Sequence, residues 1–399
     1  MFYPEKKLLV AFGDKHKLTF FDNLKTSPFH QLMYLKKLKL FNFKNHLAEE
    51  FDFSPEVNCF TGPNGSGKTN VLDAIHYLAL CKSYFSGMES QNITEGAQSF
   101  TIHGLFENNG LSEDIICGLK QGQRKIVKRN QKDYTRLAEH IGLLPIVMIA
   151  PNDQELISGG SEERRKLIDS IICQVDKEYL DNLSTYQRIL LQRNALLKQL
   201  AAGKADFSSL EIWDEQLALT GNKIFNTRTA FIQEYQPLFL HFYQFITDQQ
   251  EAAVLEYESQ LQHDTMLNLL KSHSNRDRLL QYTTTGIHKD DLKLSLNEKP
   301  VRRFGSQGQQ KSFVVALKLA QFEYIKQATG KKPMLLLDDI FEKLDDERMN
   351  KLLELVSDKE FGQLFVTDTH KGRAEKVFGK LKKEVAAFHF MIQQKDTAG

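Results

Sequence analysis

The chain reads Gly62-Pro63-Asn64-Gly65-Ser66-Gly67-Lys68-Thr69 directly after the short apolar run Val57–Thr61 and directly before the helix-compatible stretch Thr69–Leu80. These eight residues match the pattern G-x-x-x-x-G-K-[ST] at every fixed position. Glycines let the backbone wrap closely around phosphate groups, while backbone amides and a helix N-terminus oppose the negative charge. The order of strand, loop and helix therefore predicts a phosphate-binding loop built from all eight residues.

Two side chains of this loop suit a nucleoside triphosphate and its metal. Lys68 can reach the β- and γ-phosphates, and the Thr69 hydroxyl can ligate Mg²⁺. A second element of phosphoryl transfer lies far along the chain, where the apolar run Met334–Leu337 ends in Asp338 and Asp339. Asp338 would hold Mg²⁺ through its water shell, and Asp339 could accept a proton from the attacking water. We therefore predict ATP and Mg²⁺ as ligands.

The pattern of apolar residues changes twice between these two elements. From Met33 to about Pro151, short β-branched and aromatic runs predict strands around one helix. From about Ser161 to Tyr282, apolar residues recur at three- and four-residue steps, which predicts helices. Strands return after Tyr282, so an α/β fold is interrupted by a helical insertion. The predicted strands are Leu35–Phe43, Val57–Thr61, Ser99–Phe106, Ile115–Leu119, Lys125–Lys128, Leu144–Ile149, Met334–Leu337 and Gln363–Thr367, and helices are predicted at Trp213–Phe225, Arg228–Phe245 and Lys311–Lys326.

Length and composition narrow the class of protein. A chain of 399 residues is long enough for two lobes, and no apolar run reaches the length that a bilayer requires. The net charge is only +1, so any nucleic-acid surface must be a local patch. Four scattered cysteines, without metal-ligand spacing, favour reduced thiols in a cytosol. Residues 1–32 precede the first clear strand, and we expect them to be an N-terminal extension that contributes little to the fold.

A third motif indicates the class of ATPase. Gly305-Ser306-Gln307-Gly308-Gln309-Gln310-Lys311 opens the predicted helix Lys311–Lys326 and resembles the signature sequence of the ABC ATPase family. In that family the motif reaches across a head-to-tail dimer to the partner's ATP. The resemblance implies that Ser306, Gly308 and Gln309 contact ATP bound to the other subunit. The stretch Lys343-Leu344-Asp345 matches the family's D-loop, which implies that Asp345 lies near the dimer seam.

Two other elements of that family match less well. The stretch Ile149–Asp153 stands where a glutamine loop is expected but carries a Pro-x-Asp pattern. The predicted strand Gln363–Thr367 leads into Asp368-Thr369-His370, where the histidine comes two places later than usual. Either Asp368 or His370 could sense the γ-phosphate, and we assign this catalytic role to His370.

Within the class, the chain resembles the RecF family of bacterial DNA-repair ATPases from Met33 to about Thr369. Ile287 and Lys311 depart mildly from the family pattern, in which proline and arginine are usual. The resemblance implies an ABC-type P-loop ATPase head with a compact helical lobe. Its segments would be an ATPase part at 33–155, a helical lobe at 156–282 and a second ATPase part at 283–399. The matching segments are Gly62–Leu72, Ala150–Asp153, Arg164–Asp169, Gln192–Lys198, Trp213-Asp214, Gly286–Asp291, Ser306–Lys318 and Leu335–Asp346.

The resemblance also implies a function. Members of the family are cytoplasmic, nucleoid-associated proteins that dimerise on ATP and bind DNA at single-strand gaps. With RecR- and RecO-type mediators they help to load the RecA recombinase. Weak, DNA-stimulated ATP hydrolysis would act as a switch, without a membrane partner. A basic stretch could supply the DNA contacts through Lys125, Lys128, Arg129 and Lys132.

Some alternatives stay open at this point. Arg164 and Arg165 could face DNA or pair with acidic residues. A transport ATPase subunit would need a membrane partner, and the large helical insertion argues against it. An SMC-like chromosome tether would need hundreds of residues of coiled coil, which this chain is too short to contain.

Overall fold

The computed structural model describes residues 33–204, 209–247, 251–340, 345–357, 361–373, 377–378 and 384–391. The predicted N-terminal extension, residues 1–32, lies outside the described residues, as do Lys343 and Leu344 of the predicted D-loop. None of the helices in the described part of the chain is both long enough and apolar enough to cross a membrane.

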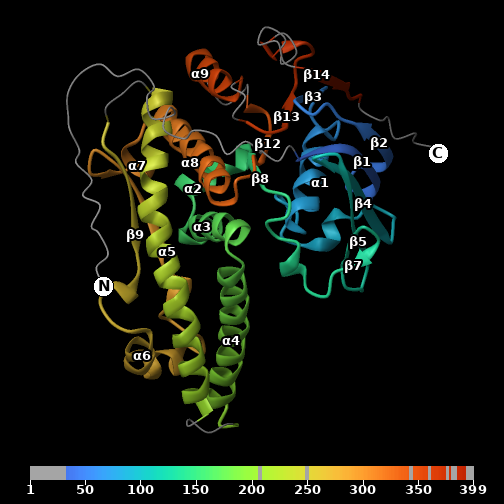
Figure 1. Cartoon of the computed structure of the whole chain (residues 1–399). Helices are drawn as coiled ribbons and strands as arrows, with labels where there is room; N and C mark the ends of the chain where they lie inside the picture. Colours follow the sequence, from blue (N-terminus) through green and yellow to red (C-terminus); the bar gives the residue numbers. More distant parts are fainter. Residues whose placement is uncertain are drawn as a thin grey trace, which may run out of the picture. The chain divides into compact units, whose positions relative to one another are not determined.

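A five-stranded parallel sheet carries the phosphate loop (Figure 1). Its strand order is β14-β3-β13-β12-β8, and every neighbouring pair is parallel. Strands β3, β8, β12 and β13 are buried along their whole length, because helices or another sheet cover both faces. The bounds are Val57–Thr61 for β3, Ile146–Ile149 for β8, Met334–Leu337 for β12, Leu364–Asp368 for β13 and Val385–His389 for β14.

Successive side chains of these strands enter two different apolar cores, because side chains alternate between the faces of a sheet. The first core joins the sheet to the helices of the insertion and to the signature helix. The second joins it to the helix after the phosphate loop and to an antiparallel sheet. From β8 and β12 the first core takes Val147, Ile149, Leu335 and Leu337, and the second takes Ile146, Met148, Met334 and Leu336.

The antiparallel sheet has six strands in the order β2-β1-β4-β5-β6-β7. Helix α1, Lys68–Leu80, packs in the second core between this sheet and the parallel one, and most of its residues are buried. The helix that begins at the phosphate loop is therefore held on two sides. The strand bounds are Met33–Phe43 for β1, His46–Asp52 for β2, Ser99–Asn108 for β4, Leu111–Lys120 for β5, Ile126–Arg129 for β6 and Lys132–Asp133 for β7.

The remaining helices pack on the other face of the parallel sheet or extend from it. Helices α4 and α5 run side by side away from the sheets, and α8 contacts α5, α3 and β8 (Figure 1). A three-stranded antiparallel sheet, β11-β10-β9, adjoins α5. The bounds are Glu155–Ser158 for α2, Ser161–Val175 for α3, Lys177–Ala201 for α4, Ser209–Thr247 for α5, Ala253–Glu258 for β9, Met266–Leu280 for α6, Asp291–Leu296 for β10, Lys299–Pro300 for β11, Val301–Phe304 for α7, Gln307–Thr329 for α8 and Asp346–Ser357 for α9. Short 3-10 turns lie at Glu89–Asn92, Leu137–Glu139, Pro151–Gln154, Gln260–Gln262 and Ile287–Lys289.

Most predicted strands are confirmed, and Val57–Thr61 and Met334–Leu337 have the predicted bounds. The helical residues predicted at Trp213–Phe225 and Arg228–Phe245 are confirmed, but the interruption between them is wrong, because α5 is one helix of 39 residues. Thr227 Oγ1 donates a hydrogen bond to Lys223 O at 3.1 Å, so this polar stretch continues the helix.

The prediction of helix throughout Ser161–Tyr282 is also wrong, since β9 lies within it. Its buried and exposed residues alternate, which is the two-residue period of a strand. The strand pairs with β10 from Ala253 opposite Leu296 to Glu258 opposite Asp291. This pairing joins residues on the two sides of the predicted boundary at residue 282.

Candidate functional site

The phosphate loop follows β3 at the carboxyl edge of the parallel sheet and curls around the ammonium group of Lys68. Lys68 Nζ donates hydrogen bonds to Gly62 O at 2.8 Å and Pro63 O at 3.0 Å. Only 4% of the Lys68 surface is exposed. The buried ammonium group of Lys68 thus lies at the centre of the loop. A bound phosphate would replace the two carbonyl groups as the hydrogen-bond partner of Lys68.

The turn between β1 and β2 packs against the phosphate loop at Gly67. Gly67 has φ = +103°, and a Cβ there would lie 2.7 Å from Asn45 Nδ2 and 2.8 Å from His46 Cε1. Asn45 Oδ1 accepts a hydrogen bond from Asn70 Nδ2 at 2.7 Å, and His46 Nε2 lies 3.1 Å from Gly67 O. A glycine is needed at residue 67 for both backbone and space. The sequence alone did not assign Asn45 or His46 to the site, because they lie more than 15 residues before the motif.

The acids after β12 lie beside the end of the phosphate loop. Asp338 Oδ1 accepts hydrogen bonds from Thr69 Oγ1 and Thr367 Oγ1, each at 2.9 Å. The Asp339 backbone N–H donates to Thr367 Oγ1 at 2.8 Å, and Asp339 has φ = +46°. The sequence predicted that Thr69, Asp338 and Asp339 act together. The structure places all three at one edge of the sheet. Thr367, at the end of the neighbouring strand β13, is a site residue that the sequence did not single out.

This donor set fits Mg²⁺. A threonine hydroxyl and an aspartate carboxylate are hard oxygen ligands of the kind that Mg²⁺ takes together with water and phosphate oxygens. Within the described residues, no group of three or more His, Cys, Asp or Glu side chains could hold a metal ion without such help. Thr69 and Asp338 would hold the ion, and the nucleotide would supply further ligands.

The side chain of Asp338 has a raised pKa. Burial raises its pKa from the ordinary 3.8 to about 6, although hydrogen bonds from Thr367 and Thr69 oppose this shift. Between pH 3.8 and about 6 the folded protein keeps a proton on Asp338 that the unfolded chain releases. The contribution of Asp338 to stability therefore falls as pH rises through this window.

The same shift predicts a pH dependence of nucleotide binding. Mg²⁺ needs the ionised carboxylate, so we expect the affinity for Mg·ATP to fall about tenfold between pH 7 and pH 5. Isothermal titration calorimetry across this range measures the effect. Asp338→Asn is the control, because residue 338 no longer titrates in it. Parallel profiles for the two proteins would contradict the prediction.

The signature residues lie at the N-terminus of α8. Ser306 Oγ accepts a hydrogen bond from Gln309 N at 3.2 Å, and Gln309 Oε1 accepts one from Ser306 N at 2.7 Å. This reciprocal pair is a capping box, which fixes the first turn of the helix. Ser306 is exposed, and so is Asp345 in the residues that precede α9. Contact of these residues with a partner's ATP stays a prediction, because a single chain is described.

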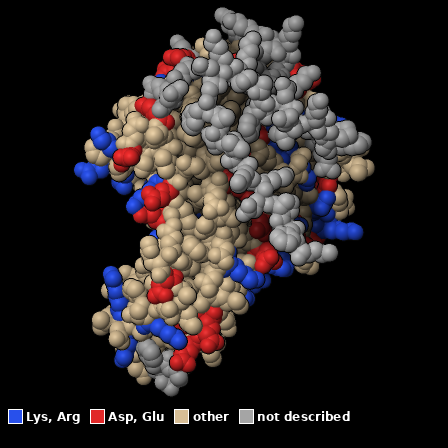
Figure 2. Space-filling view, turned by 60° about the vertical axis from the view of Figure 1, so that its left-hand side comes forward, with Lys and Arg blue, Asp and Glu red and all other residues tan. Residues whose placement is uncertain are grey.

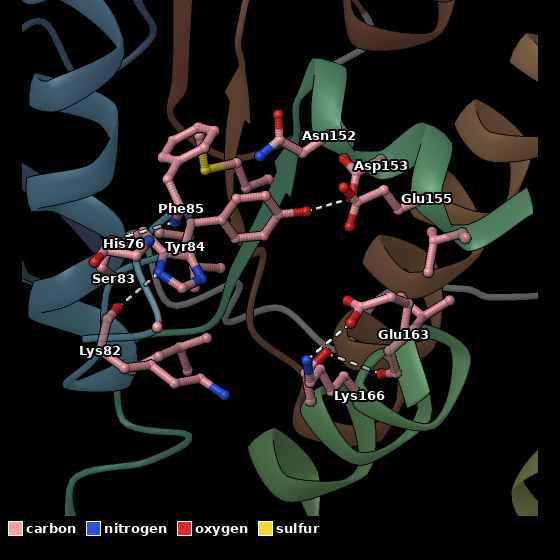
Figure 3. Close-up of a pocket in the computed structure, with 18 of the residues that line it drawn as sticks. His76, Lys82, Ser83, Tyr84, Phe85, Asn152, Asp153, Glu155, Glu163 and Lys166 are labelled. Carbon is pink, nitrogen blue, oxygen red and sulfur yellow. Dashed lines mark hydrogen bonds and ion pairs between the residues drawn. The ribbon is translucent and has the colours of Figure 1, made fainter. Parts of the chain in front are cut away.

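The loop after β8 holds two polar residues with different partners. Asp153 accepts hydrogen bonds from Ala150 N at 2.7 Å and from Tyr84 Oη, and it pairs with Lys318 Nζ at 2.7 Å. Figure 3 shows the Tyr84 hydroxyl pointing at Asp153, and both residues line a cavity of about 520 Å³. Gln154 instead lines a second cavity of about 380 Å³ beside Asp338, and its Nε2 donates to Gln310 Oε1 at 2.9 Å. Gln154, one place after the Pro-x-Asp pattern, therefore lines the same cavity as Asp338.

The two candidates for a γ-phosphate sensor lie in different surroundings. Asp368 is buried, and its carboxylate accepts two hydrogen bonds from Arg373, at 2.6 and 2.8 Å. His370 is exposed, and its backbone N–H donates to Asp368 Oδ1 at 3.1 Å. The role predicted for His370 stays a prediction.

The basic residues predicted to face DNA lie just before β6, on β6 and on β7, and mostly have acidic neighbours. Lys125 pairs with Glu89, Lys128 Nζ lies 3.7 Å from Asp133, and Arg129 donates to both oxygens of Glu113. Lys132 is exposed. Of the alternatives for Arg164 and Arg165, the structure shows Arg164 in a two-point contact with Asp291, at 2.7 and 3.0 Å, and Arg165 bonded to Asp290 O at 2.6 Å.

Known proteins resemble this chain along most of its length. The RecF/RecN/SMC N terminal domain family matches residues 34–389. The DNA replication and repair protein RecF of Flavobacterium johnsoniae is 50% identical over 346 residues, which cover 86% of this chain and 96% of that protein. A solved structure of the recombination mediator protein RecF with ATP in the RecFOR pathway has a TM-score of 0.81 at 30% identity, covering 87% of this chain and 95% of that one. The Smc head domain of Pyrococcus furiosus shares the fold, with a TM-score of 0.52 at 17% identity over 90% of this chain and 94% of that one.

Proposed function

The chain belongs to the RecF family of ABC/SMC-type ATPases, and from this we propose that it is an ATP-dependent DNA-binding protein of replication and repair. One observation carries the proposal. The phosphate loop and the acid pair, 269 residues apart in sequence, meet through the 2.9 Å hydrogen bond between Thr69 and Asp338. A hydroxyl and a carboxylate at this distance suit a triphosphate with its metal. The 50% identity to a RecF protein favours DNA repair over the transport and chromosome-tether alternatives.

ATP hydrolysis would use the groups at the sheet edge. Lys68 would hold the β- and γ-phosphates, and bound Mg²⁺ would neutralise their charge. Asp339 would orient the attacking water and accept its proton. Its left-handed backbone and the hydrogen bond from Asp339 N–H to Thr367 hold this acid in place beside Asp338. Turnover would be slow, so that ATP acts as a switch.

The switch would be a dimer that closes on two ATP molecules. Ser306, Gly308 and Gln309 would contact the ATP of the other subunit, with Asp345 at the seam. Ser306 and Asp345 are exposed in the single chain, as this role requires. His370, also exposed, would sense the γ-phosphate.

The ATP-bound dimer would bind DNA at single-strand gaps. There, RecR- and RecO-type mediators would help to load the RecA recombinase. The molecular face in Figure 2 mixes Lys and Arg with Asp and Glu side chains, so phosphate contacts would come from a local patch. Of the four cations predicted to face DNA, exposed Lys132 is the best placed, since Lys125 and Arg129 have acidic partners.

Asp339→Asn is expected to accumulate the ATP-bound dimer. The amide cannot take the proton of the attacking water, so ATP would remain in the closed interface. Size-exclusion chromatography with light scattering, in saturating Mg·ATP, measures the dimer fraction. Asp52→Asn, an exposed acid paired with Lys37, is the control and should behave as wild type. A monomeric Asp339→Asn protein at high ATP would contradict the switch.

A further inference from the structure

Arg348, in the first turn of α9, connects the residue predicted to lie at the dimer seam to the signature helix. Its Nε donates a hydrogen bond at 2.7 Å to the hydroxyl of Ser312, a fully buried residue of α8. Its Nη1 forms an ion pair with Asp345, and its backbone N–H donates to Asp345 Oδ1 at 3.0 Å. One side chain therefore binds both elements at once.

The same guanidinium lies close to Gly308 of the signature motif. A Cβ on Gly308 would lie 3.2 Å from Arg348 Nη2 and 3.4 Å from both Cζ and Nη1. The first of these distances is tighter than ordinary van der Waals contact and the other two are at its limit, so with a side chain at residue 308 the guanidinium would have to shift by a few tenths of an ångström. Arg348 thus contacts α8 at residue 308 and again one turn later at Ser312.

We propose that Arg348 is a positioning residue that fixes Asp345 to the N-terminal turn of α8, so that the seam and the signature form one preformed surface for the partner subunit. This inference rests on the proposed ATP-dependent dimer. Arg348 itself touches no nucleotide in this scheme. A guanidinium suits the task because its donors diverge in a fixed plane, whereas a lysine ammonium is a single point charge.

A preformed surface favours closure for a physical reason. Side chains that must be ordered during association weaken binding, and groups already held in place do not. The Arg348 and Asp345 side chains are 26% and 51% exposed, so their ion pair contributes little to the stability of the monomer. Loss of Arg348 should therefore weaken the dimer and leave folding and ATP binding in the monomer nearly unchanged.

The test measures two affinities for each variant with a non-hydrolysable ATP analogue. One is binding of the analogue at protein concentrations far below dimer formation, and the other is the dimer dissociation constant by analytical ultracentrifugation. For Arg348→Ala and Arg348→Lys we expect a dissociation constant raised about tenfold and analogue binding within about twofold of wild type. Lys351→Ala, one turn further along α9, is the matched control and should leave both unchanged.

A double-mutant cycle separates positioning from simple loss of charge. If Arg348 acts through Asp345, then Arg348→Ala with Asp345→Ala should weaken the dimer no more than either change alone. Fully additive losses, or a wild-type dimer constant for Arg348→Ala, would overturn the inference. A wild-type protein that stays monomeric with the analogue would instead overturn the proposed function. If Arg348→Ala melts at a much lower temperature than wild type, Arg348→Lys and Ser312→Ala decide in its place by the same split between the two affinities.

Discussion

Lys68→Met is expected to lower the affinity for ATP at least about 100-fold and to abolish dimer formation on ATP. Lys68 is buried within the phosphate loop, and its donors are held by two loop carbonyl groups in the free chain. Methionine keeps the length of the side chain but removes the charge. Charge-assisted hydrogen bonds contribute about 1.5–3 kcal/mol each, so the loss of two explains the expected factor.

Calorimetric titration with Mg·ATP measures this loss. The matched control is Lys82→Met, which removes an exposed lysine just beyond the end of α1 and should keep the wild-type affinity. Thermal melting of both variants without nucleotide verifies that each is folded. An affinity for ATP within about threefold of wild type in Lys68→Met would mean that the loop does not bind the triphosphate.

Arg228→Met is expected to lower the free energy of unfolding by about 3–5 kcal/mol, which is the usual cost of removing one partner of a buried ion pair. Arg228 lies in α5 and is 1% exposed. Its guanidinium bonds to Asp290 Oδ2 at 3.0 Å, Asp169 Oδ1 at 2.8 Å and Ile287 O at 2.8 Å. Without it, Asp290 would remain buried and without its cationic partner.

Chemical denaturation followed by circular dichroism and by fluorescence measures the change, provided that both probes give one transition. Lys223→Met, on the same helix, is the control. Its ion pair with Glu178 is exposed, so its loss should cost less than about 1 kcal/mol. A similarly small effect for Arg228→Met would show that the network between α5 and the segment Ile287–Asp290 does not hold the insertion together.

The sequence identified residues that the fold brings together, because these residues lie in contiguous motifs. The residues Gly62–Thr69 and the pair Asp338-Asp339 follow strands whose ends meet at one edge of a parallel sheet. Which strand ends meet at that edge depends on the order of the strands in the sheet. Local sequence patterns indicate this order only indirectly. The supporting residues Asn45 and Thr367 come from other strands, and no local pattern marks them.

The helical insertion was predicted less accurately, because tertiary contacts decide its elements. The sequence pattern predicted two helices here, yet α5 is continuous and buries Arg228 against acids from two other segments. Strand β9 was missed because its alternation is only six residues long and lies between helices. Its partner β10 is more than 30 residues away, and the pairing supplies the hydrogen bonds that make it a strand.

The central claim is that ATP controls binding to DNA, and fluorescence anisotropy of a labelled gapped duplex tests it most directly. Binding is measured at fixed salt with Mg·ATP, with Mg·ADP and without nucleotide, for the wild type and for Lys68→Met. We expect tight binding with ATP alone and its loss in Lys68→Met. Equal binding of the wild type in all three conditions, or none in any, would contradict it.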